Sequence, residues 1–322
     1  MDERELTQAQ QNALAELRTG FNQAIARAPE PGREDPSPRR RFAGFTAAAA
    51  GLAVVGLIVW AVASPSDSRV TVDDAIASIA DVAASTEAPS PGAYVYSRTR
   101  IHATQRAIGD MYEGRGIEAG DQFSVVQERE TWLSMKRPGL TRVIVDSPVG
   151  PREPKVGFEK QPALGQYHFA DRRYSYAQVQ KFAKDPAPLI DEIERAAATS
   201  RPVQDRTQTL WRYLSEPLIA FSPPLPSSIR AALIRGLEEV DGVSVDTTAN
   251  DSKDRGGEQL AVVTNGLRLA LLFDPENATL LESTTTVERK GAGPYPDSPP
   301  GTVLHQITLI TQRTVPELPS TD

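Results

Sequence analysis

A long apolar run near the N-terminus constrains this chain more than any other feature. The run begins at Phe42, ends at Ala63 and reads FAGFTAAAAGLAVVGLIVWAVA, 22 residues without one charged side chain. As an α-helix it would be about 33 Å long, which matches the hydrocarbon thickness of a bilayer. We therefore predict a transmembrane helix over residues 42–63, which would anchor the chain in a lipid bilayer.

The arginines around this run predict its orientation. The 15 residues before it hold five arginines, whereas the 15 residues after it hold only Arg69. Because positive residues are retained on the cytoplasmic side, we expect a cytoplasmic N-terminus and an extracytoplasmic domain over residues 65–322.

The end of the run leaves one alternative open. Ala61, Val62 and Ala63 fit the A-x-A pattern of a signal peptidase site. Against cleavage, the apolar stretch is longer than the usual core of a signal peptide, so a retained anchor is the favoured interpretation. Both readings place the large domain outside the cell membrane.

The segment before the anchor divides into two parts. Residues 1–28 carry one apolar stripe, which includes Leu6, Leu14, Leu17, Phe21 and Ile25, and this spacing predicts an amphipathic helix. Residues 29–41 are a proline-rich basic linker. A single amphipathic helix cannot bury its own stripe, so it meets a cytoplasmic protein partner or the membrane surface, or it stays partly frayed. A weakly ordered tail is the favoured interpretation, and a helix that docks on a cytoplasmic partner is the alternative.

Composition excludes several classes of function. The chain has no cysteine, which excludes disulfides, thiol catalysis and cysteine-based metal sites. The formal net charge is -7, and residues 1–41 are electrically balanced, so the negative excess lies in residues 65–322. An acidic outer domain disfavours nucleic acid as a partner.

Patterns in the outer domain predict a helix, then strands, then helices, then strands again. The first helix covers residues 71–85, with Thr71 as its N-cap. Later helical segments cover 177–199, interrupted by Pro186 and Pro188, then 206–221, and then 226–240, which Ser227 or Ser228 would cap.

Strands are expected in AYVYSRTRIHAT, QFSVVQERETWLS and TRVIVD, while residues 147–167 read as loop-rich. In the first of these strands the alternation places Tyr94, Tyr96, Arg98 and Arg100 on one, wetter face. In the last strand region, Asn265 and Gly266 predict a type I′ hairpin.

This order of elements is typical of an α+β fold with a mainly antiparallel sheet. We expect a curved sheet of six to eight strands, with helices packed on one face and held in its concavity.

Several blocks of the sequence also carry a resemblance. They are the anchor after the triple arginine, PGAYVYSRTR at Pro91, WLS at Trp132, YSYAQVQKFAKDPAPLIDEIERAA at Tyr174, PLPSSIRAALIRGLEEVDGVSV at Pro224 and LRLALLFDPENATLLESTTTV at Leu267. In these blocks the chain resembles a family of uncharacterised actinobacterial single-pass membrane proteins with an anti-sigma-factor-like layout. The resemblance implies a short cytoplasmic lead, one span and a large extracytoplasmic domain similar to lipoprotein carriers. It implies no activity and no catalytic residues.

The residues show no recognised catalytic, metal-binding or cofactor-binding pattern. His102, His168 and His305 follow no spacing known for zinc ligands, and Glu128 and Glu130 are expected on one side of a strand, as part of a solvated face. We therefore predict no catalytic residues, no metal and no cofactor.

Aromatic residues concentrate in the first half of the outer domain. Tyr94, Tyr96, Phe123 and Trp132 are the candidates for contact with an apolar ligand on a concave sheet face. The alternative is that the aromatic residues of this region form the core against the middle helices. The prediction is a membrane-anchored, non-enzymatic extracytoplasmic binding or sensory protein, which binds a hydrophobic envelope ligand or a partner protein. The alternatives are a structural envelope protein without a small ligand and a secreted hydrolase of unrecognised type.

Overall fold

A computed structural model describes residues 70–106, 121–146, 155–163, 166–199, 206–219, 223–292 and 297–319. The transmembrane helix predicted over residues 42–63, the amphipathic helix over 1–28 and the linker over 29–41 lie outside these ranges. Within the ranges, no helix has the length and apolar character needed to cross a membrane.

The described elements follow the predicted order of one helix, a run of strands, a run of helices and a second run of strands, and they belong to one compact unit of the chain. The first half contains α2 (Val72–Ser85), β1 (Tyr94–Arg106), β2 (Gln122–Leu133), β3 (Pro138–Asp146), β4 (Lys155–Ala163), β5 (Gln166–Phe169) and β6 (Arg172–Ser175). The middle contains α3 (Tyr176–Phe182), α4 (Ala187–Thr199), α5 (Arg206–Ser215), the 3-10 turn η2 (Glu216–Leu218), α6 (Ser227–Arg235) and the 3-10 turn η3 (Gly236–Glu239). The last part contains β7 (Ser244–Asn250), β8 (Gly256–Thr264), β9 (Leu267–Phe273), β10 (Leu280–Val287) and β11 (Val303–Val315).

The main sheet has nine strands in the order β4-β3-β2-β1-β11-β10-β9-β8-β7. Every pair of neighbours in it is antiparallel. The order describes two meanders that are joined by the pairing of β1 with β11, while β5 and β6 form a separate small hairpin. The fold class predicted from the sequence is confirmed, but the main sheet exceeds the expected six to eight strands.

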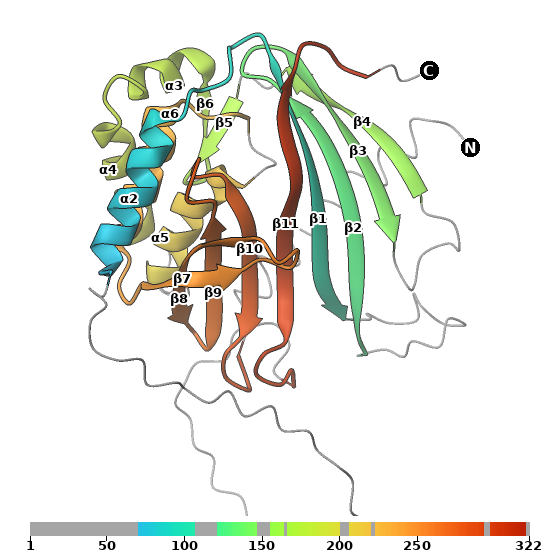
Figure 1. Cartoon of the computed structure of the whole chain (residues 1–322), viewed down its shortest axis with the longest axis vertical. Coiled ribbons are helices and arrows are strands. Elements are labelled where there is room, and N and C mark those ends of the chain that lie inside the picture. The colour runs from blue at the N-terminus through green and yellow to red at the C-terminus, as the bar shows by residue number, and fades with distance from the viewer. Residues whose placement is uncertain are drawn as a thin grey trace, which may run out of the picture. The chain divides into compact units, whose positions relative to one another are not determined.

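The helices cover one half of this sheet. Figure 1 shows them gathered beside β5–β6 and β7–β10, while β1–β4 extend away from them. The largest apolar cluster joins the helices to β8, β9 and β10 and includes Ile76, Leu233, Leu271 and Phe273, none of which is more than 1% exposed. Each fully buried side chain of this size contributes about 1.5–3 kcal/mol, so this half of the sheet holds the core.

The start of the domain follows the sequence prediction. Thr71 is the N-cap of α2, and its side chain accepts a hydrogen bond from the Asp74 N–H in a capping box. The predicted hairpin is also confirmed, because Asn265 and Gly266 both have positive φ between β8 and β9, as a type I′ turn requires.

The middle helices are shorter than predicted. The predicted interruption of the segment 177–199 at Pro186 is confirmed, because α3 and α4 are separated there. Helix α5 ends just before Pro217, because proline lacks the N–H that would continue a helix. The predicted serine cap of α6 is wrong. Pro226 holds the N-cap position without a side-chain hydrogen bond, and the Ser228 hydroxyl instead donates to the carbonyl of Ala183 at 2.7 Å.

The loop-rich prediction for residues 147–167 is wrong in part, because β4 runs from Lys155 to Ala163. Gly157 and Pro162 weaken the strand pattern there, and proline is tolerated because β4 is an edge strand. The β5–β6 hairpin was not predicted either. Its turn residues are Ala170 and Asp171, both with positive φ, and neither is the glycine or asparagine that usually signals such a turn.

The tip of the β7–β8 hairpin is fixed to β10 and β11. The Ser252 N–H donates to Glu282 Oε2 at 3.0 Å, and the hydroxyls of Ser252 and Thr308 lie 2.9 Å apart. Arg255 donates to the backbone carbonyl of Leu309 and to the buried carboxylate of Asp251. These hydrogen bonds hold the tip across the face of the sheet that carries Glu282 and Thr308.

Candidate functional site

Strands β11, β1, β2 and β3 present aromatic and charged side chains on one face. The strand pairings place Arg313 opposite Tyr96, Tyr96 opposite Trp132, and Arg98 opposite Glu130. Alternate residues of a strand share a face, so this surface is continuous over the four strands. We call it the aromatic–arginine face and define it by eight residues, Tyr96, Arg98, Arg100, Glu128, Glu130, Trp132, Arg142 and Arg313.

The aromatic part of this face is a packed pair of rings. The centroids of Tyr96 and Trp132 lie 5.0 Å apart with the planes tilted by 43°, a favourable arrangement for aromatic side chains. The guanidinium carbon of Arg313 lies 5.3 Å from the centroid of the Tyr96 ring, within cation–π range. Burial, followed by the hydrogen bond to Glu130, raises the pKa of Tyr96, so its hydroxyl remains protonated and donates.

The charged part of the face is a ladder of ion pairs. Glu128 accepts hydrogen bonds from Arg98 and, at 2.9 Å, from Arg100. These hydrogen bonds, that of Arg98 first, lower the pKa of Glu128. Glu130 lies 3.2 Å from Arg142 on the next strand. The carboxylates are therefore fixed between strands, while the arginine side chains stay accessible, with 42% of Arg98 and 57% of Arg100 exposed.

The sign of the charge on this face differs from that of the domain. The eight side chains include four arginines and two glutamates, an excess of two positive charges. The chain as a whole has a formal net charge of -7. The aromatic–arginine face is therefore a locally positive surface on an acidic protein, which favours anionic partners at this place.

The four aromatic residues selected from the sequence are not all brought together. Tyr96 and Trp132 are adjacent, and Tyr94 lies on the same face but is only 3% exposed beneath the guanidinium of Arg137, 4.5 Å from its ring centroid. Phe123 lies nine residues from Trp132 on β2, about 30 Å along the strand, and on the opposite face. Tyr94 and Phe123 are therefore not part of the candidate site.

Other aromatic residues of this region form the core, which was the alternative interpretation. Tyr167, Phe169 and Tyr174 belong to the apolar cluster under the helices. The arginines of the face were not selected from the sequence, although Arg98 and Arg100 continue the alternation of Tyr94 and Tyr96. That alternation was the signal that could have identified them.

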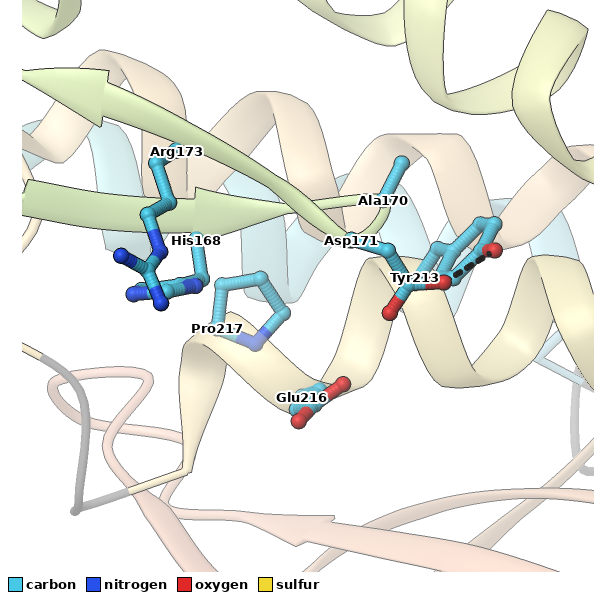
Figure 2. A pocket seen from close by; sticks show the side chains of 7 residues that line it. All are labelled: His168, Ala170, Asp171, Arg173, Tyr213, Glu216 and Pro217. Atoms are coloured by element: carbon cyan, nitrogen blue, oxygen red, sulfur yellow. Dashed lines mark hydrogen bonds between the residues drawn. The ribbon is translucent and has the colours of Figure 1, made fainter. Parts of the chain in front are cut away.

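A second, smaller candidate is a polar pocket of about 210 Å³ beside the β5–β6 turn, shown in Figure 2. It is lined by His168, Ala170, Asp171, Arg173, Tyr213, Glu216 and Pro217. The Tyr213 hydroxyl donates to Asp171 at 2.7 Å, and Arg212 donates to the same oxygen at 3.3 Å. Burial and then this bond raise the pKa of Tyr213. The pocket is smaller than typical ligand sites, and its Asp171 carboxylate is already bound within the protein.

The three histidines do not form a common site. His168 lies in the β5–β6 hairpin, whereas His102 and His305 lie on the paired strands β1 and β11. Burial, followed by the nearby His102, lowers the pKa of His305, so the ring is neutral near pH 7. Across the ranges that the structure describes, no three histidine, aspartate or glutamate side chains are arranged to hold a metal ion.

Comparison of the chain with protein-family models, with curated proteins and with solved structures gives no match, so the site is interpreted from its own geometry.

Proposed function

We propose that this chain is a membrane-anchored extracytoplasmic binding protein, not an enzyme, and that the aromatic–arginine face is its binding surface. The observation that carries the proposal is the grouping of two contacting rings and four arginines from four neighbouring strands. Loops vary easily, but a surface built on paired strands is rigid, and a rigid surface binds with a smaller loss of conformational entropy.

The anchor supports a position close to the bilayer. Only seven residues separate Ala63, the end of the apolar run, from Thr71, the N-cap of the first helix. Seven residues span at most about 25 Å when fully extended, so a domain tethered in this way stays near the membrane surface. We further propose that the chain belongs to the family of single-pass membrane proteins that it resembles. In the same architecture the sheet would be curved like that of a lipoprotein carrier, and residues 1–28 would bind a cytoplasmic partner.

The character of the face refines the class of ligand. A purely hydrophobic ligand is less favoured here than a polar envelope component, because Tyr94 is covered and Phe123 is on the other face. A structural envelope protein without a small ligand, or a secreted hydrolase, would have no need of an accessible arginine surface beside the Tyr96–Trp132 ring pair.

The absence of cysteine from the chain provides a direct test of sidedness. We would introduce Lys290→Cys, at an exposed turn of the outer domain, and separately Ser37→Cys, in the linker before the anchor. Intact cells that express each variant are treated with a membrane-impermeant maleimide. The proposal expects labelling of the first variant in intact cells and of the second only after permeabilisation. Labelling in the reverse order, or of neither variant until the cells are opened, would refute the proposed location.

A further inference from the structure

The chemistry of the aromatic–arginine face points to a particular class of ligand. The guanidinium groups of Arg98 and Arg100 are planar donors that suit carboxylate and phosphate oxygens. Their pairing with Glu128 leaves them about half exposed, so each retains N–H groups directed to solvent. The face can therefore accept negative charge without losing the ion pairs that fix its geometry.

The same face also offers hydrogen-bond acceptors and rings. Glu128 can accept hydrogen bonds from ligand hydroxyl groups, which both donate and accept, whereas Oε2 of Glu130 is buried and its Oε1 accepts from Tyr96. The half-buried Tyr96–Trp132 pair provides an apolar surface beside these polar groups. Donors, acceptors and an aromatic surface in one plane match a sugar chain, whose rings have apolar C–H faces and hydroxyl edges.

We propose that the aromatic–arginine face binds an acidic polysaccharide, a chain of sugar rings that carries carboxylate or phosphate groups. The excess of two positive charges selects acidic over neutral chains. Arg98 and Arg100 lie about 7 Å apart along β1, and Arg142 lies two strands away, about 10 Å across the sheet. This spread suits an extended polymer better than a single small anion. The inference rests on the proposed function, since it requires the face to be outside the cell.

The distribution of exposed apolar side chains argues against docking of this face on a lipid bilayer. Among the residues that the structure describes, the exposed large apolar side chains are Val70, Val263 and Leu318. None of them lies on β1, β2, β3 or β11. A membrane-binding face needs apolar groups that enter the acyl region, and this face has none that are exposed.

The test uses the full chain in detergent micelles and measures its binding to polygalacturonate, with neutral dextran, anionic phospholipid vesicles and single-stranded DNA as comparison ligands. The site variant is Arg98→Gln with Arg100→Gln. The matched control is Arg289→Gln with Lys290→Gln, two exposed residues after β10 that give the same change in net charge. Circular dichroism confirms that each variant is folded.

We expect the wild-type chain to bind polygalacturonate at low salt and to lose the interaction as salt is added. The site variant should bind about tenfold more weakly, because two charge-assisted contacts are lost. The control variant should stay within about twofold of wild type.

Three outcomes would overturn the inference. They are no binding by the wild-type chain, an equal loss in both variants, and tighter binding of vesicles or DNA through the same arginines. Because the measurement uses purified protein, its failure is independent of the maleimide labelling. Failed labelling with retained polygalacturonate binding would refute the location and leave the face as a binding site.

Discussion

Tyr96 Oη donates a 2.8 Å hydrogen bond to Oε1 of Glu130, diagonally across the β1–β2 pair. This bond connects the two parts of the aromatic–arginine face. The Tyr96 ring packs against Trp132, and the Glu130 carboxylate pairs with Arg142. The position of the rings is therefore coupled to that of the charged side chains, as a preorganised binding surface requires.

The first prediction concerns this bond. Tyr96→Phe keeps the ring and its contact with Trp132 but leaves Glu130 without one donor. We expect the free energy of unfolding, measured by urea titration of the full chain, to fall by about 1–2 kcal/mol. Tyr176→Phe is the control, because the Tyr176 ring is also contacted by a cation, with Lys136 Nζ 4.9 Å from the ring centroid. This variant should change the free energy of unfolding little. An equal fall in the free energy of unfolding in the two variants would mean that the hydrogen bond from Tyr96 to Glu130 does not stabilise the fold.

A second prediction follows from the exposure of the two tryptophans that lie within the described residues. Trp132 is half-buried on the face, whereas Trp211 is 4% exposed inside α5. If a polysaccharide covers the face, polygalacturonate should reduce the acrylamide quenching of tryptophan fluorescence. The reduction should disappear in Trp132→Phe, which leaves an aromatic ring in place. A ligand-dependent change of the same size in Trp132→Phe would place the bound polymer elsewhere.

Part of this face could be predicted from the sequence. The period of two in β1 placed Tyr94, Tyr96 and Arg98 on one side, and the structure confirms it. The same period of two places Phe123 and Trp132 on opposite faces of β2, because they are nine residues apart, an odd interval. The prediction that both contact one ligand was therefore wrong. The partners of Arg98 could not be predicted, because no turn motif between β1 and β2 fixes their register.

The fold was predictable where local chemistry determines it. Thr71 and Asp74 form a capping box, and Asn265-Gly266 forms a hairpin turn, and both depend on residues only a few positions apart. The predicted serine cap failed because α6 begins at Ser227 with Pro226 as its N-cap, so Ser228 lies within the helix and its hydroxyl donates to the distant carbonyl of Ala183. Tertiary contacts of this kind leave no trace in a local pattern.

A third prediction concerns the tip of the β7–β8 hairpin and its dependence on pH. Burial alone would raise the pKa of Asp251, but hydrogen bonds from Arg255 and from the Lys253 N–H outweigh it and hold the pKa below its usual range. A lowered folded-state pKa means that the stabilisation is present above the unfolded value, near 3.9, and is lost as the pH falls through the folded value.

Asp251→Asn should therefore reduce the free energy of unfolding by about 2 kcal/mol at neutral pH. The difference from wild type should shrink as the pH is lowered below about 4, because the native carboxylate is then protonated as well. Asp254→Asn, at an exposed position of the same loop, should have little effect at either pH. A pH-independent loss in Asp251→Asn would show that the charge of Asp251 is not what stabilises the tip.

The last prediction uses two consecutive glycines at the start of β8. A Cβ atom at Gly257 would lie 2.5 Å from the backbone oxygen of Phe273, whereas at Gly256 the nearest atom, Oδ1 of Asn250, would be 3.6 Å away. The backbone oxygen cannot move aside without disturbing the pairing of β8 with β9. Gly257→Ala should therefore lower the free energy of unfolding by about 2 kcal/mol, and Gly256→Ala by less than about 1 kcal/mol. Urea titration measures both, and similar values would show that the close approach of β8 to Phe273 is not required for the fold.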